Sequence, residues 1–117
     1  MDLFDRRLTV YNSVRNSIYP AISNGYPLDE HWASFGQAQE SAKFLFGADV
    51  NDYLQELREN MANIQMHAEM AKISTGSEKQ DHLTGRRELF KKLANFDKIL
   101  TDKVRPYMEM SQKKTIF

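Results

Sequence analysis

The feature that most constrains the fold is a row of apolar residues in the middle of the chain, spaced alternately four and three residues apart. Its members are Val50, Leu54, Leu57, Met61, Ile64, Ala68 and Ala71. An α-helix has 3.6 residues per turn, so these steps keep the whole row on one helix face, as in helix bundles. The row predicts a long amphipathic helix that has Asp49 as its N-cap. The polar loop at residues 74–77 is expected to end this helix.

Three other stretches have the same helical spacing, and none alternates as a strand would. We expect helices over residues 2–23, with Pro20 inside, over residues 28–46, and over residues 78–104, where Arg105-Pro106 should end the last one. Four amphipathic helices joined by short loops predict an all-α fold, specifically a four-helix up-down-up-down antiparallel bundle over residues 1–110. The alternative is a pair of helical hairpins that completes its core by dimerising. Residues 111–117 are expected to form a frayed C-terminal tail.

Length and charge limit the classes of protein that the chain can belong to. Its 117 residues fit one domain that can fold without a disulfide or a metal. Lys plus Arg and Asp plus Glu each number 16, so the net charge favours neither nucleic acid nor an anionic membrane as partner. Cysteine is absent, which fits a reducing compartment such as the cytoplasm and excludes thiolate chemistry. The chain has no run of 18 apolar residues, and charged residues near its start argue against a secretory signal.

No arrangement of residues typical of catalysis is recognisable. The three histidines are His31, His67 and His82, and none has a glutamate three residues before it, as a di-iron bundle would require. The chain also lacks a Gly-x-Ser-x-Gly motif and a phosphate-binding glycine loop. We therefore predict no catalytic residue, no metal ligand and no cofactor, and a protein that is not an enzyme.

The clearest candidate for a binding surface is basic. Residues 78–117 contain ten Lys and Arg side chains against six Asp and Glu, whereas the preceding helix is acidic. Arg86, Arg87, Lys91 and Lys92 form a cationic side of the expected last helix, and we predict that they bind a partner. The alternative is that this helix and the acidic preceding helix complement each other in charge across their shared boundary. Glu88 and Asp97 interrupt the charge, so nucleic acid is the less favoured ligand. Phe44-Leu45-Phe46 and the six methionines would suit a partner groove too, but core filling is the favoured interpretation.

One charged residue interrupts the apolar row of the first helix. Positions 4, 8, 11, 15, 18 and 22 form that row, and its fourth member is Arg15. The corresponding row of the last helix, at 90, 93, 97, 100 and 104, contains Asp97. In an antiparallel bundle the two residues lie at similar depths, so we predict a partly buried ion pair between Arg15 and Asp97 that fixes the register of the helices. The alternative is that both side chains face solvent.

Three stretches together resemble a known group of proteins. They are residues 3–11 (LFDRRLTVY), residues 42–47 (AKFLFG) followed by Val50 and Tyr53-Leu54, and residues 105–108 (RPYM). The chain is similar in these stretches to small bacterial proteins of uncharacterised function, in which one membrane-spanning helix precedes a helical cytosolic domain. The sequence departs from that pattern, since it starts where the cytosolic part would begin.

The resemblance implies an interaction or regulatory module held at the cytoplasmic face of a membrane by a segment absent from this chain. We therefore expect a non-enzymatic helical module that binds a protein partner or associates with itself. The alternative is a small soluble nucleic-acid-binding or regulatory protein that uses the basic face of the last helix.

Overall fold

The computed structural model describes the backbone of residues 2–116 and the side chains up to Ser111. It contains the helices α1 (Leu3–Asn24), α2 (Asp29–Leu45), α3 (Ala48–Ile73), α4 (Gly76–Leu93) and α5 (Phe96–Ile116). No strand occurs in this part of the chain. The all-α prediction is thus confirmed. None of these helices is both long enough and apolar enough to cross a membrane.

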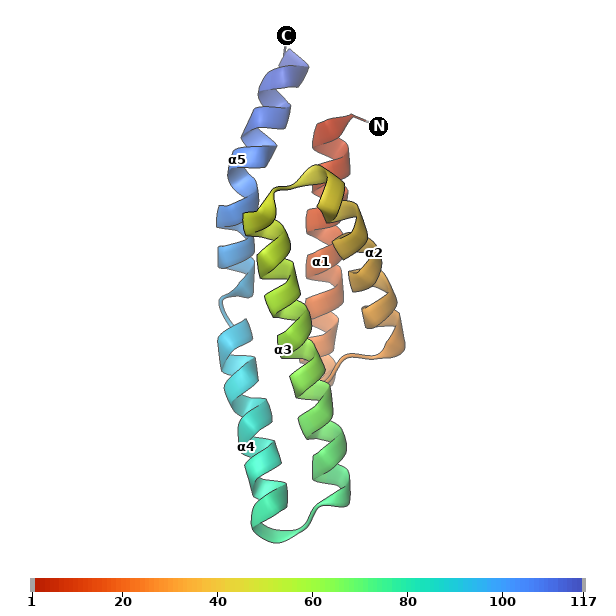
Figure 1. Ribbon diagram of the computed structural model, residues 1–117, viewed down its shortest axis with the longest axis vertical. Coiled ribbons are helices and arrows are strands. Elements are labelled where there is room, and N and C mark those ends of the chain that lie inside the picture. The colour runs from red at the N-terminus through yellow and green to blue at the C-terminus, as the bar shows by residue number, and fades with distance from the viewer. Residues whose placement is uncertain (1, 117) are drawn as a thin grey trace.

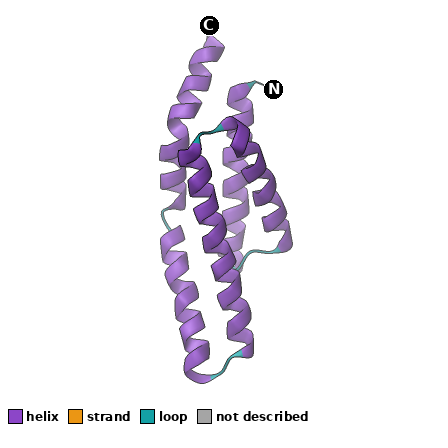
Figure 2. Cartoon of the chain, in the orientation of Figure 1, coloured by secondary structure: helices purple, strands orange, loops and turns teal. Residues whose placement is uncertain are grey.

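The helices lie roughly along one axis and form an elongated molecule. Figure 1 shows α1 beside α2 and α3 beside α4, with α5 continuing the line of α4. The molecule measures 63 × 23 × 22 Å along its principal axes. The described ends of the chain lie at one end, near the α2–α3 connection, and the α3–α4 turn lies at the other (Figure 1). Short loops make these connections, as Figure 2 shows.

The core is centred on α3, whose apolar row is buried as predicted. Every member of the row from Val50 to Ala71 has a relative exposure of 6% or less. Phe35, Ala38 and Ala42 of α2 are buried on one side of it, and Leu93, Phe96, Leu100 and Val104 of α4 and α5 complete the core. This burial follows directly from the spacing of the apolar residues, because one helix face is removed from water along its length.

The core face of α1 differs from the expected row. Its buried residues are Arg7, Val10, Val14, Ser17, Ile18 and Ala21, whereas Tyr11 and Ile22 are only partly buried. Ser17 and Ala21 are small, which allows close packing of α1 against α2. Apart from the fully buried Ile18, the row that includes Arg15 therefore lies at the edge of the core, beside α5.

The expected helix over residues 78–104 is two helices, and this boundary was predicted wrongly. Ala94 and Asn95 interrupt it, and the N–H of Ala94 donates to the carbonyl of Lys91, three residues back, instead of four. Asn has a low helix propensity, and the interruption still leaves Leu93 and Phe96 buried. α4 and α5 therefore form two successive segments of one arm.

Pro106 does not end the last helix, in contrast to the prediction. It lies inside α5, which continues to Ile116. Proline removes one helical hydrogen bond, to the carbonyl of Asp102, and both residues are exposed. Water can replace the lost bond there. Residues 111–116, expected to be a frayed tail, continue the helix, and Ser111 is buried; Phe117 lies outside the described residues.

Candidate partner-binding surface

The four basic residues predicted to bind a partner all lie on α4, but only two of them line a common groove. Arg86 is half-buried, whereas Arg87, Lys91 and Lys92 are exposed. Arg86 and Arg87 line a groove of about 310 Å³ together with Leu83 and Phe90. Lys91 forms an ion pair with Glu88 of the same helix at 3.1 Å. The structure thus brings Arg86 and Arg87 together around apolar side chains and leaves Lys91 and Lys92 outside the groove.

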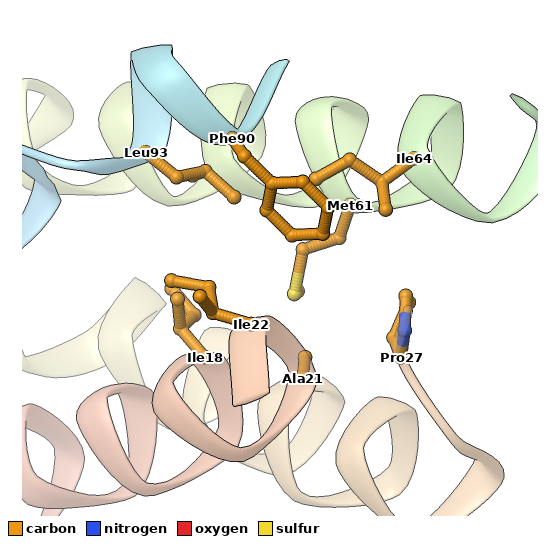
Figure 3. Close-up of a pocket in the computed structure, with 8 residues that line it drawn as sticks. All are labelled: Ile18, Ala21, Ile22, Pro27, Met61, Ile64, Phe90 and Leu93. Carbon is orange, nitrogen blue, oxygen red and sulfur yellow. The ribbon is translucent and has the colours of Figure 1, made fainter. Parts of the chain in front are cut away.

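Phe90 connects this groove with the core. In Figure 3, Phe90 and Leu93 of α4 point toward Ile18 and Ile22 of α1. The space between these side chains has no room for a water molecule. Phe90 is therefore held between the core on one side and the groove on the other, and packing fixes its position.

α4 has an open face because the α3–α4 hairpin extends beyond the end of α1 and α2. Figure 1 shows that the α1–α2 turn lies well short of the α3–α4 turn along the long axis. Within the described part of the chain, the only extensive helix contact of α4 is with α3. Of its 18 described residues only Leu93 is buried, whereas α3 buries eight. This open face carries the groove.

A second site of charged residues lies between α1 and α5, where the structure brings Arg15 and Asp97 together. Arg15 Nε lies 3.0 Å from Asp97 Oδ1, and Arg15 Nη2 donates to Oδ2 at 3.2 Å. The Nε contact lacks hydrogen-bond geometry, so only the Nη2 contact is a hydrogen bond between the two side chains. The two side chains are 36% and 31% exposed. They therefore meet at the edge of the helix contact, where solvent reaches both.

Two tyrosines of α1 extend this ion pair. Tyr19 donates a hydrogen bond to Asp97 at 2.7 Å, and Tyr11 donates a longer one at 3.4 Å. The bond from Tyr19 lowers the pKa of Asp97 below its ordinary value, and Arg15 adds to the effect. The same bond raises the pKa of Tyr19. Asp97 is thus held ionised by three residues of α1.

The most extensive polar network among the described residues was not predicted from the sequence and is centred on the buried Arg7. Its Nε donates to the carbonyl of Leu45 at 2.8 Å and its Nη1 to the carbonyl of Tyr107 at 2.9 Å, with a further bond to Ser111. The guanidinium also lies over the rings of Phe46 and Tyr107. Arg7 therefore connects α1, the end of α2 and the middle of α5.

Tyr107 extends the network to the start of α3. Its hydroxyl donates to Asp49 at 2.6 Å and accepts from the N–H of Gly47 at 3.1 Å. A Cβ at position 47 would overlap this hydroxyl, so any larger residue there would displace Tyr107 from its bonds. The N-cap of α3 is Gly47 instead of the predicted Asp49, which binds Tyr107 from the first turn. The bond from Tyr107 lowers the pKa of Asp49, and Asp49 raises the pKa of Tyr107.

The signal for this network was present in the sequence. Arg7 lies three residues before Val10 and seven before Val14, in the row that the structure buries. The predicted core row of this helix was instead the one that contains Arg15. Leu45 and Gly47 come from residues 42–47 and Tyr107 from residues 105–108, two of the stretches that carry the resemblance described above, whereas Asp49 and Ser111 lie outside them.

The histidines have structural contacts. His31 is buried, and its Nδ1 accepts from the N–H of Leu28 at the start of α2. His67 of α3 and His82 of α4 share a hydrogen bond between their Nδ1 atoms at 3.0 Å. Gly85 provides space for the His67 ring, because a Cβ there would lie 2.7 Å from His67 Nε2. Within residues 2–116, no three His, Asp or Glu side chains gather as a metal site.

Comparison with protein-family models, with curated protein sequences and with solved structures finds no significant match to this chain.

Proposed function

We propose that the protein is a non-enzymatic helical interaction module and that the open face of α4 is its docking surface. The observation that carries this proposal is that α4 has 18 residues and buries only Leu93. Helices in proteins gain most of their stability from packing of an apolar face, and a short helix alone is marginal in water. A helix with half-buried Leu83 and Phe90 beside an open groove is suited to receive a partner.

We propose the up-down-up-down antiparallel bundle as the scaffold, with α4 and α5 together as its last arm. In this arrangement α1 packs beside α5, and nothing of comparable length packs on the same side of α4. The partner is another protein or a second copy of the chain, and no catalytic or cofactor chemistry is assigned.

We further propose that the module works in the cytoplasm, tethered to a membrane through a segment outside this sequence. The support is the resemblance carried by residues 3–11, 42–47 and 105–108. Each stretch contributes one residue to a single hydrogen-bond network: Arg7 donates to the carbonyl of Tyr107, and the N–H of Gly47 donates to its hydroxyl. The network joins the start of α1 to the middle of α5. The described ends of the chain lie opposite the α3–α4 turn (Figure 1), so the α3–α4 hairpin would project away from a tether at the N-terminus.

The second candidate function is nucleic-acid binding through α4. Arg86, Arg87, Lys91 and Lys92 favour it, because cationic helix faces bind phosphates. Lys91 is neutralised by Glu88, which reduces the available charge. A salt titration separates the two candidates, since phosphate contacts weaken steeply with salt.

Site-specific photo-crosslinking in the cells that naturally make the protein tests the proposed function. A photoreactive amino acid at exposed Thr84 on α4, beside the groove but not lining it, should crosslink to a protein, whereas one at exposed Gln37 on α2 should not. A product of twice the mass of the chain would identify self-association. Equal or absent crosslinking at both positions would contradict the proposal.

A further inference from the structure

The groove on α4 combines an apolar floor with unneutralised positive charge. Leu83 and Phe90 are half-buried, and Arg86 and Arg87 flank them. None of the ion pairs between described residues includes Arg86 or Arg87. The nearby carboxylate of Glu88 is bound to Lys91 instead. A ligand that fits this groove must therefore supply both apolar groups and negative charge.

The place of the groove in the fold indicates the shape of the ligand. α1 packs beside α5, and α4 prolongs the line of α5 beyond the α1–α2 turn (Figure 1). Phe90 contacts the α1 side of the core at the point where α1 ends, as Figure 3 shows. The space beside α4 is thus the continuation of the space that α1 fills. Eighteen residues of helix are about 27 Å long, which suits another helix.

Two other classes of ligand fit less well. A second copy that docked α4 against α4 about a two-fold axis would bring the arginine pairs close together, and like charges in contact are destabilising. A nucleic acid would need a longer series of cations, and Phe90 is packed against the core and cannot serve as a free stacking surface. The net charge of zero gives no general attraction to either duplex or single strand.

We propose that the groove formed by Leu83, Arg86, Arg87 and Phe90 binds an acidic amphipathic helix of a partner protein. The partner's apolar side chains contact Leu83 and Phe90, and its Asp or Glu side chains pair with the two guanidinium groups, which can hold carboxylates through two hydrogen bonds each. This inference rests on the proposed function, because it names the chemistry of the partner that α4 receives.

Fluorescence anisotropy with the whole chain tests the inference. The probe is a labelled 18-residue helical peptide that has Leu and Phe on one face and Glu beside them. A second peptide has Lys in place of each Glu. The Glu peptide should bind and the Lys peptide should not. The variant R86E/R87E should weaken binding of the Glu peptide by about tenfold or more and should now bind the Lys peptide.

The matched control is K92E/K98E, which changes the charge of the α4–α5 arm by the same amount at two exposed positions that neither line the groove nor form an ion pair among the described residues. It should leave the affinity for the Glu peptide within about threefold of the parent, because these lysines do not line the groove. A loss as large as that of R86E/R87E would overturn the inference, since it would show general attraction to a basic helix. Circular dichroism and thermal unfolding show whether each variant is folded, and the gain of Lys-peptide binding cannot come from an unfolded chain.

The remaining outcomes are also decisive. Tighter binding of a 20-nucleotide single strand or duplex than of the Glu peptide would overturn the inference in favour of nucleic acid. A dimer that is disrupted by R86E/R87E would assign the groove to a second copy. If position 84 crosslinks to a protein in cells but the Glu peptide does not bind, the chemistry proposed here is wrong and the proposed function stands. If neither the crosslink nor binding of the Glu peptide is seen, both the proposed function and this inference are wrong.

Discussion

Arg7 and Arg15 lie about two turns apart on α1, and the structure places their guanidinium groups in different environments. Arg7 is buried and donates to backbone carbonyls, whereas Arg15 is 36% exposed and pairs with a carboxylate. Buried donors must be bonded because an unpaired charge in the core is costly. Solvent-exposed ion pairs contribute much less to the free energy of unfolding, because water screens the attraction between the charges.

The Arg15–Asp97 pair should therefore contribute modestly to stability. Arg15→Leu should lower the free energy of unfolding by about 1 kcal/mol, well below the roughly 3 kcal/mol expected when a buried carboxylate loses its partner. Chemical denaturation of Arg15→Leu, Asp97→Leu and the double variant measures the coupling. Strict additivity of the two single changes would show that the pair does not fix the helix register.

Asp49 and Asp97 should make the protein less stable in acid. Both carboxyl groups have a folded-state pKa below the ordinary value of 3.8, because tyrosine hydroxyls donate to them. A lowered pKa in the folded state means that the stabilisation is complete above the ordinary pKa and is lost as the pH falls below about 3.8 toward the folded value. The urea midpoint should fall between pH 5 and pH 2.5. In the D49N/D97N variant this fall should be smaller, and an unchanged fall would contradict the assignment.

At the scale of the helix, the contact between α3 and α4 depends partly on a glycine of α4 that leaves room for a side chain of α3. Alanine normally stabilises a helix interior by up to about 1 kcal/mol relative to glycine. Gly36 of α2 has open space around its missing Cβ, whereas Gly85 of α4 lies against the ring of His67. The same substitution should therefore have opposite effects at the two positions.

Gly85→Ala should destabilise the protein by about 1 kcal/mol, because the His67 ring must move and lose its bond to His82. Gly36→Ala should stabilise it by about 0.5 to 1 kcal/mol. In a His67→Ala background, Gly85→Ala should become stabilising. Thermal and urea unfolding of these variants are the measurements, and destabilisation that persists in the His67→Ala background would refute the steric explanation.

Helix α5 depends on α1 for the position of its second half. Arg7→Met should destabilise the protein by about 3 kcal/mol, since it removes three charge-assisted hydrogen bonds that join Leu45, Tyr107 and Ser111. Arg6→Ala, at an exposed position next to it, should change stability by less than about 0.5 kcal/mol. Hydrogen exchange should show faster opening of residues 105–111 in Arg7→Met. Equal exchange in both variants would place the role of Arg7 elsewhere.

At the scale of the molecule, the α3–α4 hairpin extends beyond α1 and α2 and makes the protein long. Its Cα radius of gyration is 16.4 Å, compared with about 13 Å for a compact chain of this length. Small-angle X-ray scattering of the monomer should give a value near 16 to 17 Å. A value near 13 Å would mean that α3 and α4 fold back onto α1 and α2 in solution, and the open face of α4 would then not exist.

The sequence by itself determined the helical class and the core face of α3, because a strict alternation of four and three is a property of consecutive residues. It also indicated the Arg15–Asp97 contact, since a charge within an apolar row calls for a partner at the same depth. The burial of Arg7, the continuation of α5 through Pro106 and the division of the basic stripe into a groove and an exposed remainder were decided only by the tertiary structure. Each depends on how distant segments are placed in the fold. The carbonyls of Leu45 and Tyr107 surround Arg7, and Asp102 is exposed to solvent where Pro106 removes its helical hydrogen bond. The groove is open because α1 ends before it reaches the level of the α3–α4 turn. Local periodicity shows which face of a helix is apolar, but only the packing of the other helices decides how far along that face the burial extends.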